Sequence, residues 1–145
     1  MTVQEQIGFT LTKISQRSIT IRCGVTITTA QPPIDGNIGF GAVVATRSIV
    51  VIPTISFLQD DEAFISLSIE VVFALRQTAW EALVTQDGHL LIPAGFAQHL
   101  GVIAIGSCRG YLSAKLEADA AYRDIILPTI DLTKMLVEDV LVELA

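Results

Sequence analysis

The stretch that decides the fold runs from Phe96 to Leu136 and reads FAQHLGVIAIGSCRGYLSAKLEADAAYRDIILPTIDLTKML. No Asp, Glu, Lys or Arg occurs between residues 88 and 108, which include the first part of this stretch. A helix at a protein surface normally keeps one charged stripe toward water. Residues 97–108 have none, so we expect a helix covered on every side, by the chain's own sheet on one side and by a partner on another.

The overall composition points to surplus apolar surface. The chain of 145 residues is 51% hydrophobic and 17% charged, and its mean hydropathy is +0.59. An average domain carries about 25% charged residues. Apolar surface left over after folding usually becomes an interface or a binding groove, so we expect a homo-oligomer, a dimer or a tetramer. The net charge of −6 argues against a nucleic-acid partner, because phosphates require Lys and Arg.

Three further features limit the class of protein to which this chain can belong. The apolar run is interrupted by Gln98, His99 and several glycines, whereas a membrane-spanning helix needs about 20 mostly apolar residues. The N-terminus lacks the basic start and apolar core of a signal peptide, which predicts a cytoplasmic protein. Two cysteines, Cys23 and Cys108, make neither a disulfide framework nor a metal site. We therefore expect one domain over residues 1–145, with no metal, no cofactor and no membrane span.

The first half of the chain predicts antiparallel strands. Residues 63–76 alternate apolar and polar side chains, which is typical of a strand with one buried face. The acidic turn Asp60–Glu62 joins it to a second strand, residues 43–58, in a hairpin. In residues 9–22 the apolar positions change parity twice, which predicts a strand with bulges or a bend. We expect residues 23–41 to form a loop, because they contain Pro32-Pro33 and several glycines.

The second half predicts helices, and with the sheet it defines an α+β fold. We expect a short helix over residues 78–84 with a capping box of Thr78 and Glu81, and then an extended piece over residues 89–93. The main helix should run from about residue 94 to 116 or somewhat beyond. After a connection that ends extended before Pro128, a shorter C-terminal helix capped by Asp131 is predicted. Its apolar stripe comprises Leu132, Met135, Leu136, Val140 and Leu144.

Catalytic chemistry finds little support in the residues. The sequence Gly106–Gly110 places Ser107 and Cys108 beside Arg109, but it is not a G-x-S-x-G motif and does not follow a strand. A thiol in the middle of an apolar helix would be inert. The two histidines, His89 and His99, have no acid or cysteine nearby at metal-ligand spacing. We therefore expect that the protein is not an enzyme.

Several residues give the chain a resemblance to the SecB-type export chaperones. Phe9, Lys13, Ile14 and Ile19 resemble the aromatic, basic and isoleucine positions of that family's first strand. Leu100-Gly101 resembles the Leu-Gly that opens the family's long helix. Arg109 resembles the Arg of that helix, and Pro128 resembles the Pro of the loop before the family's last helix, although the aromatic–Pro pair that normally precedes the Arg is missing.

The resemblance implies an ATP-independent chaperone that binds unfolded or precursor polypeptides in apolar grooves, as a tetramer with its helices packed between two sheets. Glu70 is the only acid inside a predicted strand, so binding of clients is better supported than docking of the export motor SecA. A dedicated partner-binding module of a toxin–antitoxin or phage system stays open as an alternative. We expect Gly106 to sit at a close helix contact. The residues predicted to form the client-binding or oligomer interface are Leu100, Val102, Ile103, Gly106, Arg109 and Tyr111.

Overall fold

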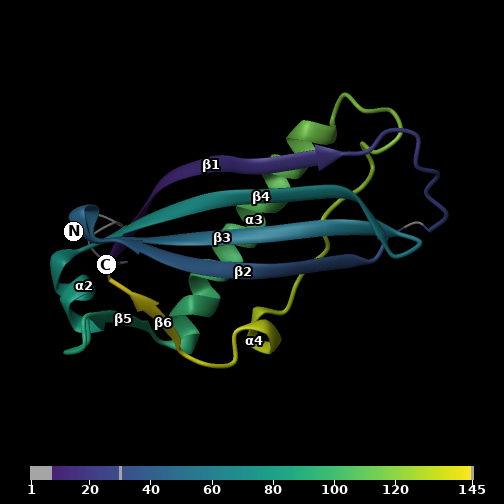
Figure 1. The fold of residues 1–145 in the computed structure, drawn as a ribbon. Helices are drawn as coiled ribbons and strands as arrows, with labels where there is room; N and C mark the ends of the chain where they lie inside the picture. The colour runs from purple at the N-terminus through teal and green to yellow at the C-terminus, as the bar shows by residue number, and fades with distance from the viewer. Residues whose placement is uncertain (1–7, 30, 145) are drawn as a thin grey trace.

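The computed structural model describes residues 8–29 and 31–144, and it has the α+β architecture that the sequence predicts. A large antiparallel sheet, a long helix and a second, smaller sheet are its main parts (Figure 1). In chain order the elements are β1 (Phe9–Ile21), β2 (Ile34–Val43), η1 (Val44–Thr46), β3 (Ser48–Gln59), β4 (Glu62–Leu75), α2 (Gln77–Leu83), β5 (His89–Ile92), α3 (Ala94–Leu116), α4 (Leu132–Met135) and β6 (Val140–Glu143).

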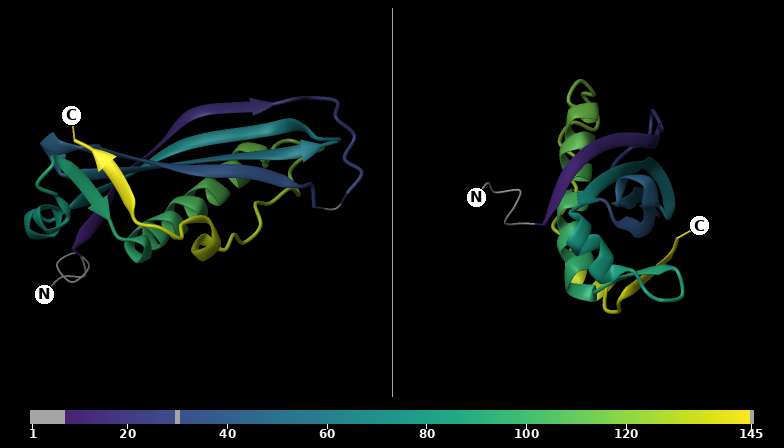
Figure 2. Two further views of the ribbon diagram at one scale, coloured as in Figure 1. Left: turned by 60° about the horizontal axis from the view of Figure 1, so that its bottom comes forward. Right: turned by 90° about the vertical axis from the view of Figure 1, so that its left-hand side faces the viewer.

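The large sheet has the strand order β1-β4-β3-β2. Three consecutive strands are joined in sequence, and β1 reaches β2 through a long connection while pairing with β4, which is a Greek-key arrangement. Figure 2 shows that the sheet is strongly curled and that α3 packs against one of its faces. The other face is not covered by any of the described helices.

The alternation in β4 decides which face of the sheet meets α3. The odd-numbered apolar residues of β4 are buried, and those of β3 are buried with them because paired residues share a face. On the opposite face lie hydroxyl pairs, such as Thr54 with Ser68 at 3.0 Å and Ser56 with Ser66 at 2.9 Å. The buried set is Ile49, Val51, Ile55, Phe57, Ile65, Leu67, Ile69, Val71, Phe73 and Leu75.

Two local predictions about the strands are confirmed. Asp60 and Asp61 form the turn between β3 and β4, and both have positive φ (53° and 63°), as a two-residue type I′ hairpin turn requires. In β1 the register against β4 shifts twice, between Leu11 and Lys13 and between Gln16 and Ser18. These are the two positions at which the apolar residues change parity.

The predicted loop over residues 23–41 is wrong in its second half. Ile34–Val43 forms β2, which pairs with β3 along its whole length. Glycine makes this pairing possible at Gly36, where a Cβ would lie 2.7 Å from Ile55 Cδ1 and 2.9 Å from the carbonyl oxygen of Thr54. A glycine that is typical of turns therefore allows a close approach between two strands here.

The predicted helix ends need two corrections. The capping box of Thr78 and Glu81 does not form: Arg76 is the N-cap of α2, without a side-chain bond, and Glu81 accepts a bond from Gln77 instead. Asp131 does cap α4 through the backbone N–H of Thr133 at 3.0 Å, but that helix ends at Met135. Residues 140–143 are a strand, because Val140 and Val142 alternate and pair with β5.

The long helix α3 has the predicted bounds, and its N-terminus is held from a distance. Its N-cap, Pro93, has no side-chain bond to the helix. The backbone N–H of Ala94 instead donates to Asp139 Oδ1 at 2.9 Å, 45 residues further along the chain. A carboxylate at a helix N-terminus is favourable because the helix dipole places partial positive charge there. Asp139 therefore ties the C-terminal segment to the start of α3.

Replacing Asp139 with Ala should lower the free energy of unfolding by about 1 kcal/mol, because bonds at helix N-termini are worth about 0.5–2 kcal/mol. Urea unfolding followed by circular dichroism measures this. Glu138→Ala is the matched control, since it removes the neighbouring exposed carboxylate and leaves the Ala94 bond intact. Equal stability of the two variants would contradict the role of Asp139.

Candidate functional site

The outward side of α3 is a stripe that contains no Asp, Glu, Lys or Arg, as the charge-free sequence predicts. Its members are exposed and recur every three or four residues, so they share one side of the helix. Val102 is the largest apolar member and is 59% exposed. The stripe consists of Gly95, His99, Val102, Gly106, Gly110 and Ser113.

On one flank the stripe meets the underside of β1. Leu11 and Ile14 lie on the α3 side of β1, since they pair with the buried Phe73 and Val71, yet they are 43% and 44% exposed. Tyr111 bridges the two elements, because its hydroxyl donates to Gln16 Oε1 at 2.7 Å. Among the described residues no strand pairs with the outer edge of β1, so backbone groups are open along that edge.

On the other flank the stripe meets the strap, which we define as residues 125–136. Arg109 holds it: Nε donates to the carbonyl of Leu127 at 2.7 Å and an Nη donates to that of Pro128 at 2.9 Å. Gln98 donates to the carbonyl of Leu136 at 2.7 Å. Leu132 packs onto Gly101, where a Cβ would lie only 2.9 Å from its Cδ1.

A groove separates the strap from the helix. It has a volume of about 620 Å³, and a smaller hollow of about 110 Å³ beside it is lined by Ile105 and Arg109, among others. The walls are mostly apolar and carry a few hydroxyl, amide and carboxylate groups. Such a mixture suits an apolar side chain whose attached backbone also needs hydrogen-bond partners. The groove is lined by Gly95, Gln98, His99, Val102, Thr129, Ile130, Asp131, Leu132 and Thr133.

The predicted interface residues divide into three groups. Val102 and Gly106 are exposed on the stripe, and Arg109 stands at its edge, where it fastens the strap. Ile103 and Tyr111 are half-buried toward β1 and pack on the core. Leu100 is fully buried in the core, so its place in the interface is a wrong prediction: within an apolar helix the sequence does not show which side the sheet covers.

Several residues of this region were not predicted from the sequence to take part in an interaction surface. Leu11 and Ile14 read as buried strand residues, because an alternating pattern does not reveal where a sheet extends past its helix. The ring of Phe9 packs edge-on against Phe96 and His99, with centroids 5.7 and 5.8 Å apart, which anchors the start of β1 to α3. These exposures and contacts depend on how β1 lies against α3, which the local sequence does not show.

The thiol of Cys108 has the character expected of a core residue. Cys108 is fully buried, and burial raises the pKa of its thiol to about 11, although the positive charge of Arg109 acts in the opposite direction. The thiolate, which is the nucleophilic form, is therefore disfavoured at neutral pH. Ser107 donates its hydroxyl to the carbonyl of Ile103 at 2.9 Å within the helix.

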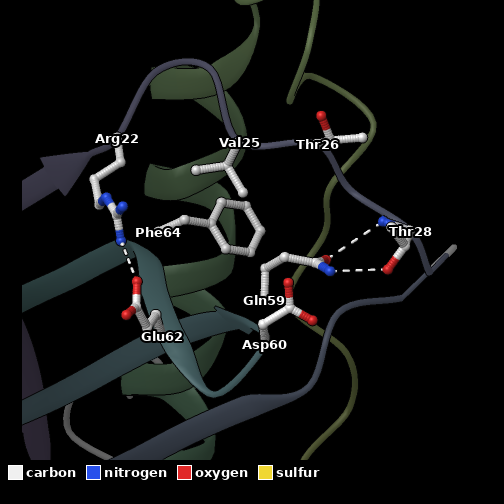
Figure 3. Close-up of a pocket in the computed structure, with 8 residues that line it drawn as sticks. All are labelled: Arg22, Val25, Thr26, Thr28, Gln59, Asp60, Glu62 and Phe64. Carbon is white, nitrogen blue, oxygen red and sulfur yellow. Dashed lines mark hydrogen bonds and ion pairs between the residues drawn. The ribbon is translucent and has the colours of Figure 1, made fainter.

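A second cavity, of about 500 Å³, lies at the end of the sheet where the β1–β2 connection passes the β3–β4 turn (Figure 3). Arg22 pairs with Glu62 at 3.2 Å across it. Gln59 holds Thr28 through two hydrogen bonds, of 2.8 and 3.3 Å. These polar groups bind one another, so their evident role is to fasten the connection to the hairpin.

The described residues contain neither a cluster of metal ligands nor a membrane-spanning helix. No group of three or more His, Cys, Asp or Glu side chains within residues 8–29 and 31–144 could hold a metal ion. Nor does any helix in that part of the chain have the length and apolarity to cross a membrane.

Comparisons with models of protein families, with characterised proteins and with solved structures gave no match to this chain.

Replacing Arg109 with Met should loosen the strap, because the part-buried carbonyls of Leu127 and Pro128 lose a charged donor while an unbranched, apolar stem is kept. We expect the free energy of unfolding to fall by about 2 kcal/mol, since bonds to charged groups contribute about 1.5–3 kcal/mol. Trypsin cleavage after Lys134, followed by mass spectrometry, should become faster than in the wild type. Lys115→Met removes an exposed charge from the same helix and should leave the cleavage rate unchanged.

Proposed function

We propose that this protein is a non-enzymatic, ATP-independent chaperone of the SecB type, which binds non-native polypeptides in the cytoplasm as a homo-oligomer. The observation that carries the proposal is the surface around the stripe. An uncharged helix side, the exposed Leu11 and Ile14, and the groove beside the strap adjoin one another. Contiguous apolar surface of this kind is typical of an interaction site.

Two features of the fold support the family resemblance. An antiparallel sheet followed by a long helix has the order of elements that the resemblance implies. Arg109 and Pro128, which resemble the family's Arg and Pro, are in direct contact through the carbonyl of Pro128. The uncovered face of the sheet carries Ser and Thr pairs where the family carries acids, so we do not extend the proposal to SecA.

The surface suggests how an extended client segment would bind. The open edge of β1 offers backbone donors and acceptors, which recognise any sequence, as in strand addition to a sheet. Apolar client side chains would contact Leu11, Ile14 and Val102, or enter the groove. No step in this mode of binding needs a nucleotide, because burial of apolar surface supplies the free energy.

A dedicated partner-binding module is the second candidate function. One apolar hollow favours it: Val102, Ile130 and Leu132 surround it together with the hydroxyl of Thr129, as in sites that select a particular ligand. A toxin or a phage protein with one matching side chain would then be the natural partner.

The chaperone proposal predicts that the protein suppresses aggregation of two unrelated, chemically unfolded proteins at a near-stoichiometric ratio and without ATP. Light scattering after dilution of the unfolded client measures this. Val102→Asp places a charge on the stripe at an exposed position and should weaken protection of both clients. Protection of neither client by the wild type, together with tight binding to one protein encoded nearby, would favour the dedicated module.

The oligomer is tested with Gly106→Leu. Apart from the backbone of α3 and the two neighbours of Gly106, no described residue lies within 4 Å of a Cβ built at Gly106, and Leu is the better helix former by about 1 kcal/mol. The substitution should therefore leave the isolated chain folded, while a partner that packs closely on Gly106 is pushed away. Gel filtration with light scattering should show a mass above 15.6 kDa for the wild type and a smaller mass for the variant.

Ala82→Leu, at an exposed position of α2, is the matched control and should keep the wild-type mass. A wild-type chain that is monomeric at micromolar concentration would refute the oligomer. An unchanged mass for Gly106→Leu would show that no close contact exists at that glycine.

A further inference from the structure

Arg109 carries a positive charge that no carboxylate neutralises among the described residues. Its Nε and Nη2 donate to the carbonyls of Leu127 and Pro128, which are neutral acceptors. Neither of the two ion pairs found within residues 8–29 and 31–144 includes Arg109. Charged groups that are removed from water are normally paired with an opposite charge. Arg109 therefore keeps the capacity to bind an anion.

One nitrogen of the guanidinium is open to such an anion. Nη1 carries two N–H groups and makes no hydrogen bond to any described residue. Among the buried and half-buried residues that the structure describes, every buried side-chain nitrogen or oxygen has a hydrogen-bond partner. Arg109 is half-buried, so its unpartnered Nη1 must be accessible from outside. A carboxylate that binds there gains a charge-assisted hydrogen bond.

The surroundings of Arg109 are apolar. Arg109 lines the hollow of about 110 Å³, whose walls share Val102, Thr129, Ile130 and Leu132 with the groove of about 620 Å³, so the hollow and the groove adjoin. A single water needs only about 10–15 Å³ of such volume, so the hollow has room for a group of several atoms. A ligand that fits both spaces carries an anion directly beside an apolar group.

The groove also has a direction. Asp131 is the only carboxylate among the residues that line it; Asp131 does not line the hollow and does not pair with Arg109. The groove extends about 10 Å along α3 from Gly95 to Val102, and Arg109 follows about 10 Å further on. About three residues of extended chain cover the first of these distances. Asp131 favours N–H donors in the groove, and Arg109 favours a negative charge in the hollow.

We propose that the hollow binds the C-terminal α-carboxylate of another polypeptide, whose last side chain is apolar and lies in the adjoining groove. Nη1 of Arg109 donates to the carboxylate, and the preceding residues lie along α3 toward Gly95. Recognition of a chain terminus through its carboxylate is an established mode of peptide binding. The inference rests on one part of the proposed function, namely that the groove binds polypeptide, and it names the part of the polypeptide that is bound.

Other anions match the site less well. A phosphate group carries nearly two negative charges and is normally held by several donors, whereas the hollow offers one guanidinium beside mostly apolar walls. An aspartate or glutamate side chain has no apolar branch next to its carboxylate. In a C-terminal residue the α-carboxylate and the side chain leave the same Cα, so one residue can fill the hollow and the groove together.

The test compares two short, dye-labelled peptides that both end in Ala-Val-Leu and differ only at the C-terminus, which is a free carboxylate in one and an amide in the other. Fluorescence anisotropy during titration with the full-length protein gives both Kd values. The amide should bind about tenfold more weakly, because it cannot form the charge-assisted bond with Arg109. A carboxylate peptide with serine in place of the last leucine should also bind more weakly.

Arg109→Gln separates recognition of the carboxylate from support of the strap, because glutamine keeps N–H donors for the strap carbonyls and removes the charge. In this variant the two peptides should bind with equal Kd. An effect on the strap alone would change both Kd values by the same factor and keep their ratio at about ten. Lys115→Gln removes an exposed cation from the same helix and should keep the wild-type ratio. Circular dichroism should confirm that each variant is folded.

Methyl NMR of the wild-type protein locates the carboxylate peptide without any variant. The largest shift changes should fall on Val102, Ile130 and Leu132, which line both spaces. Largest changes at Leu11 and Ile14 would place the peptide beside β1 and overturn the inference. Equal Kd values for the two peptides in the wild type, or no binding of either, would also overturn it.

The aggregation assay keeps this inference separate from the chaperone proposal. Suppression of aggregation together with equal Kd values for the two peptides would support the chaperone and refute recognition of the carboxylate. Selective binding of the carboxylate peptide without suppression of aggregation would support the inference and refute the chaperone.

Discussion

The packing of α3 on the odd-numbered face of β3 and β4 is the constraint on which the rest of the structure depends. Each strand alternates strictly enough that only one face of the sheet can be buried in bulk. One long helix covers that face, and its own opposite side then has to face outward. Because this helix has almost no charge, folding of a single chain leaves an apolar side exposed. The fold and the interaction surface therefore have the same origin.

The strap covers a flank of α3 that the sheet does not reach. One flank of α3 extends past the sheet toward β2, where the strap fills the space with non-strand backbone and the short helix α4. Extended backbone without strand partners needs other hydrogen bonds, and Arg109 and Gln98 supply them from the helix. Glycine at position 101 lets Leu132 approach closely. The only positive charge on this part of the helix is thus occupied with backbone carbonyls, which leaves the stripe itself uncharged.

Much of this architecture could be predicted from local pattern. The alternation in β4 and the two parity changes in β1 follow from periodicity in the sequence, and α3 has the bounds predicted from a charge-free stretch. The wrong predictions concern segments whose secondary structure depends on a partner that is distant in the sequence. The glycines of β2 look like loop residues until β3 lies beside them, and Val140 fits a helical stripe as well as a strand that pairs with β5. Within the site, an apolar helix predicts exposure of some residues but does not show that Leu100 faces the sheet and Val102 faces outward.

The bond from Ala94 to Asp139 sets an order of events during synthesis. The ribosome delivers α3 well before the carboxylate that completes its N-terminus, because 45 residues separate the two. Over that interval β5 also lacks β6, the strand with which it pairs. Closing a loop of this length has an entropic cost that grows only slowly with the number of residues, but the contact cannot form early. A nascent chain would therefore expose the apolar helix to solvent before its own strap and last strand arrive.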